Sequence, residues 1–144
     1  MFSKSILLVL LLTFTYLPFL STGNGIAGTD QELKVSYLQK KPDDGCGCGF
    51  YDIRDARKRL IVEGDYADVI WINIDGRDIR LKQEGPEQKK GKYSVVRYRS
   101  NDITVRTELY KTGEGYESVD LEGFVIVIRG KQKTFVKVKG GCGC

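Results

Sequence analysis

The chain has 144 residues, which is room for a single domain, and its composition of 41% hydrophobic and 29% charged residues is typical of a globular protein. Its formal net charge of +4 is too small to indicate, by itself, a protein that binds nucleic acid. Histidine is absent, which excludes Ser-His-Asp and Cys-His catalysis and any zinc site built on histidine.

The first 23 residues have the features of a secretory signal peptide. Lys4 precedes an apolar run over residues 6–12, and small residues further on offer cleavage sites after Gly23 or Gly25. The apolar run is shorter than the roughly 20 residues that a membrane-spanning helix needs. We therefore expect the signal to be removed, no transmembrane segment to remain, and the protein to be periplasmic or extracellular.

The mature chain is predicted to begin with a flexible, glycine-rich segment over residues 24–31 and to continue as one β-domain over residues 32–144. No internal repeat or low-complexity segment divides this domain. Export places its four cysteines in an oxidising compartment, where cysteines normally pair.

The first elements of the domain are short. Leu33, Val35 and Tyr37 alternate with polar residues, which predicts a strand with one buried face. A single helical turn is compatible with residues 52–59, and a short apolar run over residues 60–62 predicts another strand.

The clearest local signal is a hairpin over residues 67–81. Asp75-Gly76 separates two strand-like runs, and this dipeptide favours a two-residue type I′ turn because both positions need positive φ. A two-residue turn fixes the register, and the isoleucines of the first run then share one face, which we assign to the core. The predicted cross-strand pairs are Ile74–Arg77, Asn73–Asp78, Ile72–Ile79, Trp71–Arg80 and Ile70–Leu81.

The rest of the domain alternates between strand-like runs and turn-rich loops. The continuous β-branched run over residues 124–128 is typical of a strand that is covered on both faces. Many short strands with closely spaced turns predict an all-β fold, a small antiparallel barrel or sandwich of about eight strands. Strands are predicted over residues 93–99, 103–110, 124–128 and 135–139, and loops over residues 84–91, 100–102 and 111–115.

Two Cys-Gly-Cys units enclose nearly all of the predicted strands. In an extended backbone, residues two apart point to the same side, so each unit presents both of its sulfurs together. Antiparallel units would pair Cys46 with Cys144 and Cys48 with Cys142, and this is the pairing that we prefer. Such disulfides would clasp the two ends of the domain.

Other arrangements of the same four cysteines stay open. Parallel units would pair Cys46 with Cys142 and Cys48 with Cys144, and bridges within each unit would be strained and easily reduced. Four thiolates would also suit zinc or Cu(I), although structural zinc sites prefer a wider spacing within each cysteine pair. These alternatives predict a thiol-based metal-binding or redox protein.

Two further groups of residues are candidate sites. Asp65, Asp68, Asp75 and Asp78 gather near the predicted hairpin, but their spacing matches no calcium loop, and we interpret them as turn and surface residues. Basic and aromatic residues alternate along the predicted strands, as they do in proteins that bind single-stranded nucleic acid, although tyrosine and exposed arginine are also ordinary strand residues. Trp71 could in addition anchor a partner or lie in the core of a second covered face. The candidate partner-binding residues are Trp71, Arg80, Arg97, Arg99, Arg106 and Tyr110.

The hairpin over residues 67–81 resembles a hairpin in the exported inhibitors of c-type lysozyme, which are small bacterial β-barrels. The resemblance covers about a tenth of the chain and implies a barrel. That family's inhibitory loop carries a Ser-Gly-x-x-Tyr motif, which is absent here, and a net positive chain is poorly suited to a basic lysozyme. No site residue is carried over.

The sequence thus predicts an exported, non-enzymatic β-domain, stabilised by disulfides, that binds a protein or a component of the cell envelope. It indicates no catalytic residue and no cofactor, and it disfavours nucleic acid as the partner. The partner's identity and the oligomeric state are not indicated.

Overall fold

A computed structural model describes residues 32–40, 45–65 and 68–144; the predicted signal peptide and the predicted flexible segment lie outside these ranges. The described residues form ten β-strands and no helix, so none of them belongs to a helix that could cross a membrane. The strands are β1 (Val35–Ser36), β2 (Gly47–Asp52), β3 (Leu60–Gly64), β4 (Val69–Ile74), β5 (Arg77–Gln83), β6 (Gln88–Lys90), β7 (Tyr93–Ser100), β8 (Ile103–Glu114), β9 (Ser118–Arg129) and β10 (Gln132–Gly143).

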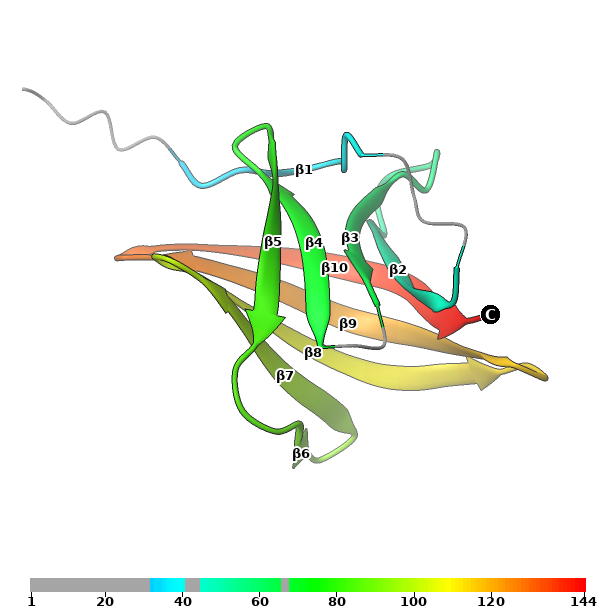
Figure 1. The fold of residues 1–144 in the computed structure, drawn as a ribbon. Helices are drawn as coiled ribbons and strands as arrows, with labels where there is room; N and C mark the ends of the chain where they lie inside the picture. The colour runs from blue at the N-terminus through cyan, green and yellow to red at the C-terminus, as the bar shows by residue number, and fades with distance from the viewer. Residues whose placement is uncertain (1–31, 41–44, 66–67) are drawn as a thin grey trace, which may run out of the picture. The chain divides into compact units, whose positions relative to one another are not determined.

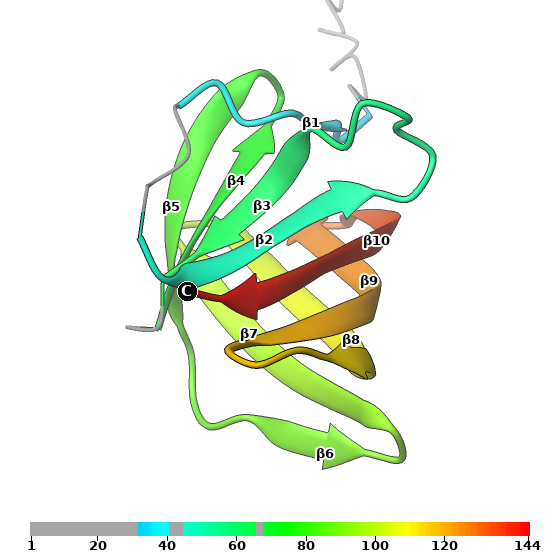
Figure 2. The ribbon, with the colours of Figure 1, turned by 90° about the vertical axis from the view of Figure 1, so that its right-hand side faces the viewer.

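Eight of these strands close into an antiparallel barrel. Strands β2, β3, β4, β5, β7, β8, β9 and β10 are neighbours in chain order, and β10 returns to pair with β2. The short strands β1 and β6 lie outside this cycle, beside β4 and β7. The long strands β7–β10 cross behind β3–β5 (Figure 1), and the seam of β2 with β10 closes the wall (Figure 2). The all-β barrel is confirmed, and closure leaves it with few exposed strand edges.

The hairpin of β4 and β5 has the predicted turn and register. Asp75 and Gly76 have φ values of 52° and 80°, as a type I′ turn requires. All five predicted cross-strand pairs are present. Ile70, Ile72 and Ile74 are at most 5% exposed and point into the barrel. Turn chemistry and apolar alternation agree here, so the local sequence determines the pairing.

Several segments differ from the expectation. The predicted loop over residues 111–115 is mostly strand, because β8 runs on to Glu114 across a bulge between Lys111 and Gly113. The predicted loop over residues 84–91 contains β6. Residues 52–59 form two consecutive turns rather than a helical turn.

The barrel interior is filled by inward-facing aliphatic side chains. On β9, Val125 and Val127 are fully buried in this core. Ile126 points to the outer face but is only 2% exposed, so the prediction that both faces are covered is confirmed for the middle of that strand. The core residues at or below 2% exposure are Leu33, Ile61, Val62, Ile72, Ile74, Leu81, Val105, Val125, Val127 and Val138.

The segment before β2 is fastened to the hairpin of β4 and β5. The Lys34 amide donates to the Asp75 carboxylate at 2.9 Å, and the Gln39 and Lys40 amides donate to Asp78. The strand predicted over Leu33 to Tyr37 is reduced to the two residues of β1, with Leu33 buried and Tyr37 39% exposed. The sequence suggested that Asp75 was a turn residue and Asp78 a surface residue. In the structure, both aspartates anchor this segment.

Candidate functional site

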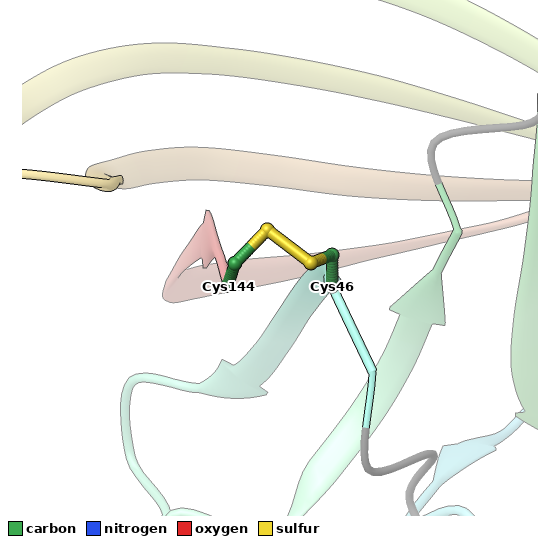
Figure 3. The surroundings of a disulfide bond; sticks show 2 residues. All are labelled: Cys46 and Cys144. Atoms are coloured by element: carbon green, nitrogen blue, oxygen red, sulfur yellow. A yellow bond between two sulfur atoms is a disulfide. The ribbon is translucent and has the colours of Figure 1, made fainter.

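The seam between β2 and β10 carries both cysteine units. In this antiparallel pair Cys48 lies opposite Cys142. Two residues further along each strand, towards Cys46 and Cys144, the same register brings these two cysteines together. Both pairs form disulfides, with Cα atoms 4.0 Å apart in the inner bridge and 4.2 Å apart in the outer one. Figure 3 shows the outer bridge joining the chain end to the residue that leads into β2. The preferred pairing is confirmed.

Glycine allows this close approach. A Cβ atom at Gly140 of β10 would overlap the carbonyl oxygen of Gly49 on β2. On the other side of β2, a Cβ atom at Gly47 would come within 2.6 Å of the carbonyl oxygen of Gly64 on β3. The backbones can therefore approach only because these positions lack side chains. The close approach of β2 and β10 allows the two disulfides to join these strands.

The disulfides leave no free cysteine. Zinc and copper bind cysteine as the thiolate, and a sulfur held in a disulfide is not a thiolate. Among the described residues, no group of three or more acidic or cysteine side chains is arranged to hold a metal ion. In this oxidised form, the four cysteines that were candidate metal ligands act as covalent links.

The four predicted partner-binding residues of β7 and β8 lie together on the outer face of the barrel. Arg97 and Arg99 alternate with inward-facing residues on β7, and Arg106 and Tyr110 do so on β8. Register places Arg97 directly opposite Arg106. These residues come from strands that are adjacent in the sheet, so their side chains share one surface.

The other two predicted residues belong to the same surface further round the barrel. Trp71 on β4 lies opposite Arg80 on β5, as expected. Two positions beyond Arg80, Lys82 lies opposite Arg99 on β7 and joins the two groups. We call the resulting surface the basic band, and its residues are Trp71, Arg80, Lys82, Arg97, Arg99, Arg106 and Tyr110.

The basic band contains two pairs of like charges on neighbouring strands: Lys82 faces Arg99, and Arg97 faces Arg106. Two of these cations have acidic partners, since Arg99 pairs with Glu84 at 3.0 Å and Arg106 with Glu108 at 2.9 Å. Like charges placed directly opposite each other destabilise a sheet. The band therefore gathers positive charge at opposed positions, where a sheet is expected to lose stability.

A small hollow lies beside the two opposed arginines. It has a volume of about 70 Å³ and is walled by Arg97, Arg106 and Lys90, with Glu84 and Val95 on the remaining sides. The side chain of Arg106 lines this hollow, and its Nε atom is buried without a hydrogen-bond partner. A buried donor without a partner is costly, and a carboxylate is the group that guanidinium donors match best. The hollow is suited to an acidic side chain.

Trp71 stands at the edge of a shallow outer groove. The groove has a volume of about 210 Å³, and its floor is formed by glycines of β2 and β3 beside Leu60 and Glu63. The Lys40 ammonium lies 5.6 Å from the centre of the Trp71 ring and pairs with Glu63. Trp71 is thus a half-buried residue of the outer face of β4.

Tyr110 closes the far end of the band. Its ring packs edge-on against Tyr93 at 5.4 Å, and the Lys92 ammonium lies 3.7 Å from the centre of the Tyr110 ring. A cation over an aromatic face is a favourable contact of roughly 0.5–1 kcal/mol at an exposed site. These contacts fix the orientation of Tyr110 before any partner arrives.

Six of the seven residues of the basic band are the candidates that the sequence suggests, and the pairing of β5 with β7 adds Lys82. Its importance depends on the pairing of β5 with β7, which are separated in the chain by the segment that carries β6. No local pattern predicts that pairing.

Comparison with known proteins found no family model, no curated protein and no solved structure that matches the chain.

Proposed function

We propose that this chain is an exported, disulfide-clasped barrel that acts as a non-enzymatic binding domain, and that its partner is a protein with an acidic contact surface. The disulfides support export, because such bonds persist in oxidising compartments. The basic band supports the choice of partner, because its cations gather over three adjacent strands.

The opposition of Arg97 and Arg106 carries the proposal. A sheet gains nothing from two guanidinium groups in directly opposed positions. Replacing either arginine with a neutral residue that favours strands would remove the repulsion between them. An acidic group from a partner would turn the same arrangement into a binding site. A bidentate contact to either guanidinium would be short, directional and stronger than a contact between neutral groups.

The composition of the basic band favours a protein over a lipid surface or a nucleic acid. Tryptophan, tyrosine and arginine are the residue types that dominate the energetics of protein interfaces. Trp71 and Tyr110 stand at the two ends of the band, with the arginines between them. Aromatic anchors of this kind need pockets on the opposite surface, which a folded protein provides.

Affinity capture from a cell-envelope extract tests the proposal. The oxidised protein serves as bait beside a variant with Arg97→Gln and Arg106→Gln and a control with Lys131→Gln and Lys137→Gln, which removes the same charge from exposed positions outside the band. We expect an acidic protein to bind the wild type and the control, to bind the Arg variant at least tenfold more weakly, and to be released by salt.

Three results would contradict the proposal. The first is a partner that binds the two variants equally, because the charge would then act without regard to position. The second is capture that persists in high salt. The third is binding to anionic vesicles or to DNA in preference to any protein. The resemblance to lysozyme inhibitors stays a prediction, which adding c-type lysozyme to the same assay would test.

A further inference from the structure

A further cavity lies inside the barrel, behind the inner disulfide and apart from the basic band. Its volume is about 200 Å³, and side chains from seven strands of the barrel line it. Phe50, Ile70, Leu109 and Leu121 contribute apolar surface, and the Cys48–Cys142 bridge forms part of the wall. Eight-stranded barrels can hold one small ligand in such a space.

Two hydroxyl groups of the lining make no hydrogen bond to another described residue. Thr107 is 4% exposed and faces the cavity from β8, and no hydrogen bond to its hydroxyl is found within the described part of the chain. The same holds for Tyr98, which faces the cavity from β7. Neither hydroxyl oxygen is fully buried, so both are open to hydrogen bonds from a ligand or water in the cavity.

The charge of the lining is acidic, in contrast to the rest of the molecule. Asp65 and Glu87 border the cavity, and its lining includes no lysine or arginine, although the chain carries 23 of these against 19 acidic residues. Burial raises the pKa of Tyr98, and the nearby carboxylates of Asp68, Glu87 and Asp65 raise it further. The field at the Tyr98 hydroxyl is therefore negative.

We propose that this cavity binds a small organic cation, an ammonium group attached to an apolar body about the size of one six-membered ring. The apolar body would lie against Phe50, Ile70 and Leu121. The ammonium would donate to the hydroxyls of Tyr98 and Thr107 and face the carboxylates of Asp65 and Glu87. A cavity of about 150 Å³ with apolar walls already holds benzene, so the volume suffices for a ring with a short side chain.

The carboxylates select against other small molecules. An anion would meet Asp65 and Glu87 without any basic residue of the lining to balance them. A neutral molecule of the same shape would satisfy the hydroxyls but gain nothing from the charges. Glu87 also pairs with Lys89 at 2.7 Å, but Lys89 is largely exposed and lies outside the lining, so water screens that contact. This site goes beyond the proposed protein partner and shares no residue with the basic band.

Calorimetric titration of the oxidised protein with three matched probes tests the proposal. The probes are phenethylamine, 2-phenylethanol and phenylacetate, which share a ring and differ in charge. We expect saturable binding of phenethylamine, at least tenfold weaker binding of 2-phenylethanol and none of phenylacetate. Amide NMR shifts with phenethylamine should concentrate at Thr107, Leu109 and Leu121.

Variants then locate the site. Glu87→Gln should weaken phenethylamine binding about three- to tenfold, whereas Glu84→Gln, a matched change in the same loop that faces the outer hollow, should leave it unchanged. Thr107→Val keeps the side-chain shape and should weaken binding without unfolding the protein. Equal binding of the three probes, shifts elsewhere, or a cavity that takes up only water and no probe would overturn the proposal.

Discussion

Arg97 lies directly opposite Arg106 in the pairing of β7 with β8, with both side chains on the outer face of the barrel. Arg106 is partly neutralised by Glu108, whereas Arg97 has no ion pair within the described residues. The excess positive charge at this position therefore belongs mainly to Arg97. Replacing a residue that serves a partner at some cost to the fold should increase the stability of the isolated protein.

Replacing Arg97 with threonine should stabilise the isolated protein. Arg97→Thr removes the repulsion and inserts a β-branched residue, so we expect the free energy of unfolding to rise by about 0.2–1 kcal/mol. Urea denaturation measures it, and the gain should shrink in high salt. Lys137→Thr, at an exposed position opposite Phe124, is the control and should have little effect. A less stable Arg97→Thr protein would show that the pair is not repulsive.

The two disulfides should stabilise the barrel in a strongly coupled way. They join residues 98 and 94 apart, so either one alone already closes nearly the whole domain. Loop-closure entropy assigns about 4.7 kcal/mol to a loop of this size, but only roughly 2 kcal/mol to the small ring that the second bridge then closes. Changing one bridge to alanines should thus cost roughly 2 kcal/mol, and changing both roughly 7 kcal/mol.

Denaturant unfolding of the three cysteine variants measures this coupling. A double loss equal to the sum of the two single losses would contradict it, because the bridges would then act on independent loops. Intact-mass measurement before and after alkylation confirms that the remaining bridge is formed in each single variant.

The parts of the fold that the sequence predicts are those where two local signals coincide. Asp75-Gly76 and the alternation of isoleucines both specify the β4–β5 register. The Cys-Gly-Cys spacing predicts that each unit presents its two sulfurs together, and the preferred disulfide pairing then depended on the direction of a seam that the structure shows to be antiparallel. Where one signal misleads, the prediction is wrong. Gly113 and Gly115 suggested a loop, yet β9 supplies hydrogen-bond partners that carry β8 through to Glu114.

The candidate sites depend more on pairing at a distance. The basic residues could be identified singly, but the repulsive contacts follow from registers that only the closed barrel defines. The inner cavity could not be predicted, because seven strands contribute to its wall and its hydroxyls are ordinary strand residues. Burial and missing hydrogen bonds, which the sequence does not encode locally, distinguish Thr107 from other threonines.

Asp78 should be critical for holding the segment before β2. Its carboxylate accepts hydrogen bonds from the Gln39 and Lys40 amides and, at 2.7 Å, from the side chain of Asn73, which is fully buried. Asp78→Ala removes all three bonds, and we expect a loss of about 1–3 kcal/mol. Hydrogen exchange should accelerate at the two amides. Asp102→Ala, in an exposed turn, is the control; equal stability of the two variants would contradict this anchor.

Acid should loosen the same segment. Hydrogen bonds from the Lys34 amide and Arg129 lower the pKa of Asp75. Burial acts to raise the pKa of Asp78, but hydrogen bonds from Asn73 and two amides together lower it. A lowered pKa in the folded state gives stability that is present above the unfolded value of about 3.9 and is lost as the pH falls through the folded value. The midpoint of thermal unfolding and the amide protection factors should therefore change little from pH 8 to 5, where no histidine titrates. Stability should fall below about pH 4. A variant with Asp75→Asn and Asp78→Asn should show a shallower fall, and an unchanged slope would show that other carboxylates dominate.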